Sequence, residues 1–216
     1  MNSKERLFYF AISFLNLLAG QLHLDWLNFT TKPLLMISLG LIYYRHIQSK
    51  ISFADKLILI ALFFSCVGDV LLMLQRYNSQ LFLFGLLGFL VTQIAYSWVF
   101  SLEYKRNFYY RIPFIVYSYG IFLLIKSDIS DTLIVPIFIY MIAITTMGIR
   151  AAERIANPSS YKIVLFGAIF FILSDSIIAI NKFSYTIPMA DFLIMSTYII
   201  GQYLIIDGLI KKKASA

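Results

Sequence analysis

Long runs of apolar residues, separated by short clusters of charged residues, recur along the whole chain. A helix needs about 20 mainly apolar residues to cross the hydrocarbon core of a bilayer, and somewhat fewer when Lys or Arg side chains at its ends reach the surface. The pattern therefore predicts an all-α bundle of about eight transmembrane helices, which forms one domain over residues 1–216. The expected spans are 7–22, 33–44, 57–74, 80–101, 112–126, 132–149, 163–181 and 190–209.

The second expected span is short, and the fifth is marginal in length. We expect the second to begin at Pro33, because proline suits the first turn of a helix, where the N–H group that it lacks has no intrahelical partner. The first span ends at residues 19–23, which lack the small-x-small pattern of a signal-peptide cleavage site. It is therefore expected to remain in the protein as a membrane span.

The composition agrees with a membrane protein. Apolar residues make up 60% of the chain and charged residues 13%, and the mean hydropathy is +0.80. Soluble domains are nearer half apolar and a quarter charged. The single cysteine, Cys66, excludes a disulfide framework and any metal site with several thiolate ligands.

The net charge of +7 follows the expected topology. With eight spans and an internal N-terminus, 14 of the 18 Lys and Arg residues lie on the inner side, and only Lys32, Arg76, Lys126 and Lys182 lie at outer ends. Such a bias is the positive-inside rule. Both termini are therefore expected in the cytoplasm, and the basic balance does not indicate nucleic-acid binding.

Three acidic residues, Asp69, Asp175 and Asp207, interrupt the expected spans. Charges inside a membrane are costly and mark a functional site by default. Asp207 lies four residues before Lys211, so an ion pair on one helix face accounts for it. Asp69 and Asp175 remain as the candidate catalytic residues.

Asp69 and Asp175 occupy matching positions in their spans. Each lies 13 residues beyond a lysine at the inner boundary, which places both about 20 Å from the inner edge at 1.5 Å per residue. Each is followed seven residues later, on the same helix face, by a base, Arg76 or Lys182. The two spans run in the same direction, so a four-plus-four parallel repeat would bring the carboxyl groups side by side.

Other polar side chains extend this candidate site. Lys32 reaches a similar depth if its helix extends that far, where it would neutralise a carboxylate or bind a phosphate; alternatively, its side chain only reaches the outer interface. The fourth and eighth spans contribute Gln93, Tyr96, Tyr198 and Gln202. Singly, such residues often join neighbouring helices, but together with two acids they indicate a polar cavity.

Several chemistries lack their residues in this sequence. Both histidines, His23 and His46, lie in expected loops, which argues against a His-ligated metal site inside the bundle. The chain has no nucleophile elbow, Walker loop or dinucleotide fingerprint. We therefore expect no metal and no cofactor, and an enzyme of this kind would use carboxyl groups for proton transfer.

Six short motifs follow one another from the second span to the last. They are KPLL at 32–35, SCVGDVLL at 65–72, GLLGF at 85–89, GAIFFILSD at 167–175, AINKF at 179–183 and YIIGQ at 198–202. As an ordered set they resemble the YhhN-type lysoplasmalogenases. Members of that family are eight-span membrane hydrolases that cleave the vinyl ether bond of lysoplasmalogens, giving a fatty aldehyde and a glycerophospho-alcohol.

The resemblance implies that activity here, with a lysophospholipid as substrate and the lipid bilayer as surroundings. It also adds Asn181, in the fifth motif, to the candidate substrate-binding residues. One departure is Gln93, because many relatives carry histidine there in a His-x-x-Tyr pattern that ends here at Tyr96. Some bacterial relatives also lack the second acid, so one chemistry need not hold for all members.

Vinyl ether hydrolysis requires a proton at the β-carbon and water at the resulting oxocarbenium ion. A protonated carboxyl group can supply the proton, while an ionised one stabilises the cation and activates water. We expect Asp69 and Asp175 in these roles, without deciding which is the acid. Lys32, Arg76 and Lys182 would hold the phosphate near the outer ends of the helices.

Two other functions use the same residues. A proton-coupled carrier also combines parallel repeats with paired intramembrane acids. A scaffold would use the acids only to pair with bases, although Lys32 cannot easily neutralise two carboxylates. The composition, rich in Lys, Ile, Phe and Tyr, favours a bacterial inner membrane; headgroup preference, chain-length preference and oligomeric state are left open.

Overall fold

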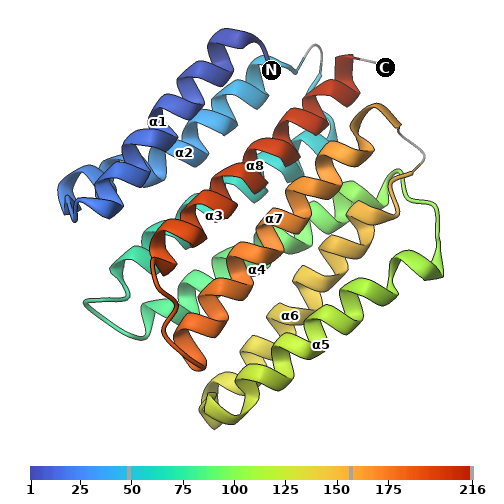
Figure 1. Cartoon of the computed structure of the whole chain (residues 1–216). Helices are drawn as coiled ribbons and strands as arrows, with labels where there is room; N and C mark the ends of the chain where they lie inside the picture. Colours follow the sequence, from blue (N-terminus) through green and yellow to red (C-terminus); the bar gives the residue numbers. More distant parts are fainter. Residues whose placement is uncertain (48–49, 156–157, 215–216) are drawn as a thin grey trace.

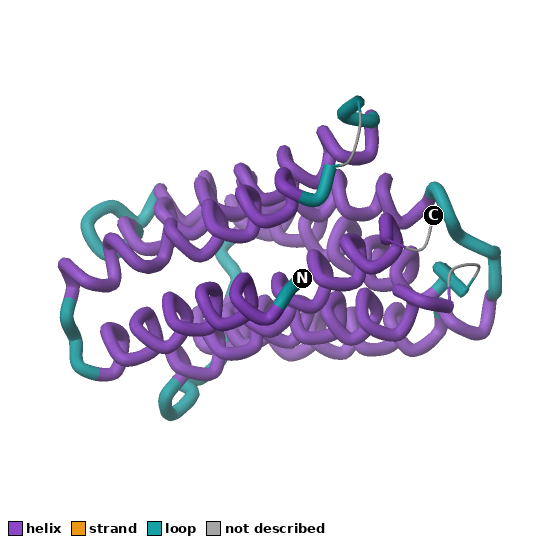
Figure 2. Tube along the Cα trace, turned by 90° about the horizontal axis from the view of Figure 1, so that it is seen from above, coloured by secondary structure: helices purple, strands orange, loops and turns teal. Residues whose placement is uncertain are grey.

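The computed structural model describes residues 1–47, 50–155 and 158–214, and within these ranges every regular element is a helix. The α-helices are α1 (Ser3–Gln21), α2 (Asp25–Arg45), α3 (Phe53–Leu74), α4 (Leu81–Ser101), α5 (Ile112–Ile125), α6 (Asp131–Ala152), α7 (Pro158–Phe183) and α8 (Ala190–Ala214), and short 3₁₀ turns η1 (Phe108–Tyr110) and η2 (Lys126–Asp128) flank α5. The helices run alongside one another, and their connections gather at the two ends of the bundle (Figures 1 and 2). The predicted all-α bundle is confirmed.

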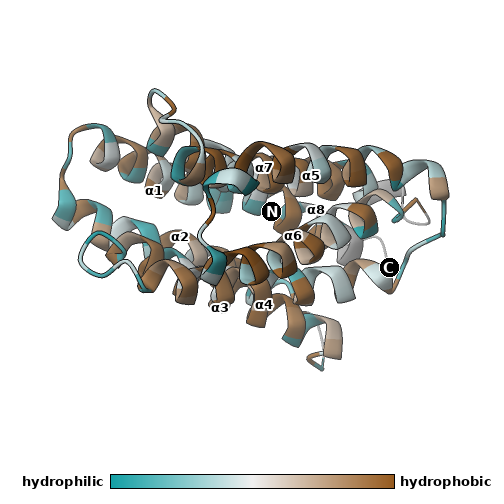
Figure 3. Cartoon of the chain, turned by 90° about the horizontal axis from the view of Figure 1, so that it is seen from below, coloured by the Kyte–Doolittle hydropathy of each residue, from teal (hydrophilic) through white to brown (hydrophobic). Residues whose placement is uncertain are grey.

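Six helices of the described chain are long and apolar enough to cross a bilayer. They are α3, α4, α5 with its flanking turns, α6, α7 and α8. Apolar residues dominate the sides of these helices, and polar residues gather towards the ends (Figure 3). The chain is therefore an integral membrane protein. Helices α1 and α2 carry more polar residues and lie beside the others (Figure 1), so the expected total of eight spans stays a prediction.

Helix α2 differs from the expected second span. It begins at Asp25, and Pro33 lies inside it, so the prediction that Pro33 begins the helix is wrong. The polar residues before Pro33 are helical because α1 satisfies them: the side-chain amide of Asn16 donates to Asn28 and to Thr31, each at 3.0 Å. An apolar run alone could not reveal this, because the partner belongs to another helix.

Two helix pairs, α3 with α4 and α7 with α8, pack most extensively. Glycines allow their backbones to come close: a Cβ atom on Gly88 would lie 3.2 Å from Cα of Gly68, and one on Gly167 would lie 2.7 Å from the backbone nitrogen of Ile205. Small residues serve this purpose between membrane helices. Each pair contains one helix that carries a candidate acid, so these contacts fix the acids in place.

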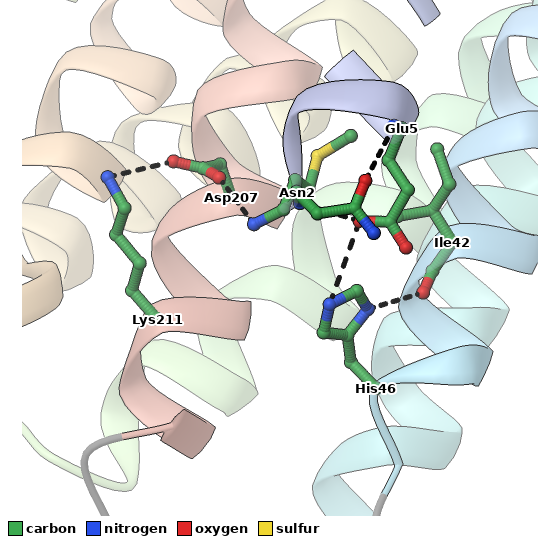
Figure 4. A network of polar contacts seen from close by, with 7 residues as sticks. Asn2, Glu5, Ile42, His46, Asp207 and Lys211 are labelled. Carbon is green, nitrogen blue, oxygen red and sulfur yellow. Dashed lines mark hydrogen bonds and ion pairs between the residues drawn. The ribbon is translucent and has the colours of Figure 1, made fainter. Parts of the chain in front are cut away.

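Polar contacts join α1, α2 and α8 at the end of the bundle where the chain begins (Figures 1 and 4). The amino group of Met1 lies 2.9 Å from Asp207, and Lys211 contacts the other carboxylate oxygen of Asp207 at 3.1 Å. The predicted pair between Asp207 and Lys211 is confirmed. Glu5 of α1 lies 3.7 Å from His46, which follows α2.

A second charged cluster lies beyond the end of α6. The fully buried Glu153 accepts hydrogen bonds from Arg111 at 2.7 Å and from Arg150 at 3.2 Å. Arg154, also fully buried, donates to Glu103 at 2.9 Å. Burial lowers the pKa of the Arg154 guanidinium, and Glu103 opposes that shift. The count of charged residues uses these arginines only to assign the topology. In the structure each of them forms an ion pair with a glutamate.

Candidate functional site

A polar hollow of about 620 Å³ opens at the end of the bundle opposite the termini. It lies among the adjoining ends of α1, α2, α3, α7 and α8. Its walls contain the three bases expected to bind phosphate, Lys32, Arg76 and Lys182, together with Asn181. The structure therefore brings together four of the candidate substrate-binding residues, which lie on three different helices or directly after them.

Two of these bases already have partners at the rim of the hollow. Arg76 forms an ion pair with Asp25 at 2.8 Å and lies over the ring of Phe29, 5.2 Å from its centroid. Lys182 donates a hydrogen bond to the side chain of Gln75 at 3.1 Å. Hydrogen bonding to Arg76 lowers the pKa of the exposed Asp25 carboxyl. Any anion bound here would compete with these existing contacts.

Asp69 lies buried on α3, just inside the bundle from this hollow. Its carboxylate accepts a hydrogen bond of 2.8 Å from the hydroxyl of Tyr198 on α8. Lys32 is close enough to attract it electrostatically. Lys32 thus faces the polar hollow and also acts on one of the two acids, so both functions expected of it are compatible with its position.

The other polar residues of α4 and α8 form a buried network with α3. The hydroxyl of Tyr96 donates to Gln202 at 2.8 Å, and the Gln202 amide donates to Ser65 at 2.9 Å. Ser65 in turn contacts the hydroxyl of Thr92 at 3.2 Å. Within the described chain, these residues are not among those that line the polar hollow. They join helices α3, α4 and α8, and the expectation that they line one polar cavity with both acids finds no support here.

Asp175 on α7 has different surroundings. It accepts a hydrogen bond from the hydroxyl of Tyr140 on α6 and lines an apolar cavity of about 70 Å³, whose walls come from α3, α4, α5, α6 and α7. The side chain of Gln93 on α4 faces Tyr140. Gln93 is fully buried, and its amide makes no hydrogen bond of regular geometry with the described residues, although the Tyr140 hydroxyl is close by.

The two acids are neighbours but not a hydrogen-bonded pair. The charge of Asp69 acts on Asp175, yet each carboxyl bonds to a tyrosine of a different helix. Leu72 and Ile178 line both the polar hollow and the apolar cavity, and each lies three residues beyond one of the acids. The boundary between the two spaces is therefore about one helical turn from both carboxyl groups.

A groove of about 330 Å³ between α5 and α6 continues from the apolar cavity. Ser118 and Met141 line both of them. The hydroxyl of Ser118 contacts that of Thr145 at 2.6 Å, which links the two helices. In α5 only Ile125 is buried, so this helix borders the cavity with few contacts of its own.

Sequence reasoning missed Tyr140 as a site residue. The available signal was a tyrosine in the middle of an apolar span, the same signal that singled out Tyr96 and Tyr198. Within the described residues, no group of three or more His, Cys, Asp or Glu side chains is arranged to hold a metal ion. The groups around the two acids are two tyrosines, the amide of Gln93 and the amine of Lys32.

Comparison with known proteins gives a consistent family. Residues 27–209 match the model of the YhhN family. The chain is 33% identical to human "Lysoplasmalogenase TMEM86A" over 153 residues, covering 68% of this chain and 62% of that protein. It is 30% identical to rat "Lysoplasmalogenase TMEM86B" over 146 residues, covering 67% and 58%, and 27% identical to the pig protein of that name over 181 residues, covering 84% and 74%.

The aligned stretch spans less than two thirds of the length of the human and rat relatives. No solved structure matches the chain. The family match covers most of the sequence, including every candidate site residue. By this match and by its apolar helices, the chain belongs to the YhhN family of membrane proteins.

Proposed function

We propose that this protein is a lysoplasmalogenase, which hydrolyses the vinyl ether bond of a lysoplasmalogen to a fatty aldehyde and a glycerophospho-alcohol. The names of its relatives support this activity. One structural observation carries the proposal: a polar hollow with three bases adjoins an apolar cavity with an acid, and the two share Leu72 and Ile178. A lipid with one hydrocarbon chain and an anionic headgroup has the matching polarity.

In this arrangement the phosphate of the substrate binds Lys32 and Lys182, with Arg76 at the rim. The hydrocarbon chain enters the apolar cavity and extends towards the groove between α5 and α6. The vinyl ether bond joins the polar and apolar parts of the molecule, so it lies near Leu72 and Ile178. Both carboxyl groups are about one helical turn from that point.

The surroundings of the two acids favour a different role for each. An apolar cavity disfavours charge, so Asp175 is the proton donor. Asp69 has Lys32 nearby and acts as the ionised group that stabilises the oxocarbenium ion. The proton of Asp175 forms the new C–H bond at the β-carbon. Water then adds to the cationic carbon and loses a proton to a carboxylate, and the hemiacetal breaks its C–O bond as the glycerol oxygen takes up a proton.

The topology belongs to the same proposal. All eight helices cross the membrane, and both termini lie in the cytoplasm, because the basic residues then gather on the inner side. The polar hollow opens on the opposite side, where a water-soluble product can leave. A bacterial inner membrane fits this arrangement.

The test uses purified protein in detergent with two lipids of the same headgroup and chain length, one a lysoplasmalogen and the other its saturated alkyl-ether analogue. Aldehyde should form from the lysoplasmalogen alone, and Asp175→Asn should lower its rate of formation about 10³-fold or more. Absence of aldehyde with the wild-type protein would contradict the proposal. A carrier would instead move a substrate across vesicles under a proton gradient and release no aldehyde in detergent.

A further inference from the structure

Gln93 is an unusual buried residue in this bundle. Its side chain is fully buried, and neither the oxygen nor the nitrogen of its amide makes a hydrogen bond of regular geometry with the described residues, although the Tyr140 hydroxyl is close by. Gln202, the comparable amide on α8, accepts from Tyr96 and donates to Ser65. A buried polar group without partners destabilises a protein, and such exceptions in a native structure require an explanation.

The position of Gln93 provides one. Helix α4 packs against α6, and the Gln93 amide faces the Tyr140 hydroxyl, which donates to Asp175. Asp175 lines the apolar cavity. The Gln93 amide is therefore linked to the proposed proton donor through one tyrosine.

We propose that Gln93, together with Tyr140, binds the water molecule that the reaction consumes. This inference rests on the proposed function. A carboxamide oxygen can accept a hydrogen bond from water, and its NH₂ group and the phenol oxygen of Tyr140 supply the further partners that a buried water needs. Water held there is beside Tyr140, which bonds to Asp175 and lines the apolar cavity.

The step is balanced without another reactant. Asp175 gives its proton to the β-carbon and becomes a carboxylate. The oxygen of the bound water forms a bond to the oxocarbenium carbon, and the proton released from that water returns to Asp175, which is then ready for the next turnover. The hemiacetal then breaks its bond to the glycerol oxygen, which takes the hydroxyl proton, and the oxygen derived from water becomes the carbonyl oxygen of the aldehyde.

The decisive variant is Gln93→Met, which keeps the shape of the side chain and removes its hydrogen-bonding groups. It should raise the melting temperature, because it removes an unpaired buried amide. It should also lower kcat about 100-fold and leave KM near the wild-type value. Gln93→His retains a donor and an acceptor and should recover kcat to within about tenfold of the wild type.

Deuterium distinguishes a water-binding role from a structural one. When water capture is slow, the protonated intermediate returns its proton, so substrate recovered from Gln93→Met in D₂O should carry deuterium at the β-carbon. Substrate recovered from the wild type should not. The matched control is Ser97→Ala, which removes another unpaired buried oxygen one turn further along α4 and should leave both kcat and the deuterium content unchanged.

The outcomes separate this inference from the proposed function. If the wild-type protein releases no aldehyde, the proposed function fails. If it does, and Gln93→Met retains the wild-type kcat or loses kcat without deuterium in the recovered substrate, the water site alone is overturned. A lower kcat together with deuterium incorporation supports it.

Discussion

Asp69 and Asp175 hold matching positions in the sequence, each 13 residues beyond a lysine, but their surroundings differ in chemical type. Asp69 has Tyr198 from α8 and Lys32 from α2 as neighbours. Asp175 has Tyr140 from α6, followed by Gln93 from α4. A cation therefore accompanies the first acid, whereas an apolar cavity accompanies the second.

The helices that supply these neighbours correspond in a regular way. A four-plus-four repeat pairs α3 with α7, α2 with α6 and α4 with α8. Helices α2 and α8 supply the neighbours of Asp69. In such a repeat they correspond to α6 and α4, which supply the neighbours of Asp175. The repeat itself stays a prediction. The comparison shows how matching helices can give two acids unlike roles by changing only the residues that face them.

The largest expected loss of activity follows from replacing the two acids. Asp175→Asn removes the proposed proton donor and should lower kcat by about 10³-fold or more, since general acid catalysis contributes about 10²–10⁴-fold. Asp69→Asn should cost less, about 10²-fold, because it removes only electrostatic stabilisation. Initial rates of aldehyde release measure both. An equal or larger loss for Asp69→Asn would reverse the assigned roles.

The next largest effect is a loss of stability when the close contact between α7 and α8 is disturbed. Gly167→Ala places a Cβ atom 2.7 Å from the backbone of α8 and should lower the free energy of unfolding by about 1–3 kcal/mol, with a displaced Asp175 and lower activity. Gly120→Ala on α5, where a Cβ atom would meet nothing within 4 Å, is the matched control. Thermal unfolding in detergent measures both, and equal melting temperatures would contradict close packing at Gly167.

The two tyrosines should differ in what their removal changes. Tyr198→Phe deletes one hydrogen bond to a buried carboxylate and should cost about 1.5–3 kcal/mol of stability. Tyr140→Phe removes a proposed water ligand and should lower kcat about tenfold or more at a smaller cost in stability. Melting curves and kcat for both variants test this. If the two variants changed stability and kcat to the same extent, the proposed difference between the surroundings of Asp69 and Asp175 would be contradicted.

The smallest effect is expected at the rim. Arg76 is exposed and already paired with Asp25, so Arg76→Gln should raise KM only about two- to threefold, an effect that salt weakens. Lys182→Gln should raise KM more, and Lys126→Gln, outside the residues that line the polar hollow, should not change it. Unchanged KM for both Arg76→Gln and Lys182→Gln would exclude phosphate binding by these bases.

The same ion pair has a defined pH dependence. Arg76 lowers the pKa of the Asp25 carboxyl below its usual value, so the pair contributes fully above the ordinary pKa of an aspartate, which is about 3.9. It is lost as the pH falls through the lowered pKa. The KM difference between wild type and Arg76→Gln should therefore stay constant near neutral pH, and a change between pH 6 and 8 would point to another group.

The sequence predicts the helices and the bases well because each depends on local pattern. Apolar runs locate α3 to α8, and Lys32, Arg76 and Lys182 gather because helix length brings them to the same end of the bundle. The start of α2 was missed because its polar residues bond to Asn16 on another helix.

The surroundings of the acids could not be predicted in the same way. They depend on how each helix is rotated about its axis, and apolar residues on all sides of a membrane helix give little information on rotation. Tyr140 was therefore not distinguished from other tyrosines in the chain, and Gln93 could be named but not placed. Both residues belong to the surroundings of Asp175, the proposed proton donor.

The arrangement of the two hollows also bears on how the reaction ends. The polar hollow opens at an end of the bundle, and the apolar cavity continues into the groove between α5 and α6. If a lysoplasmalogen is cleaved where they meet, the aldehyde would diffuse sideways into lipid while the glycerophospho-alcohol passes into the aqueous phase. Neither fragment would have to leave before the other, so inhibition by one product should be independent of the concentration of the second.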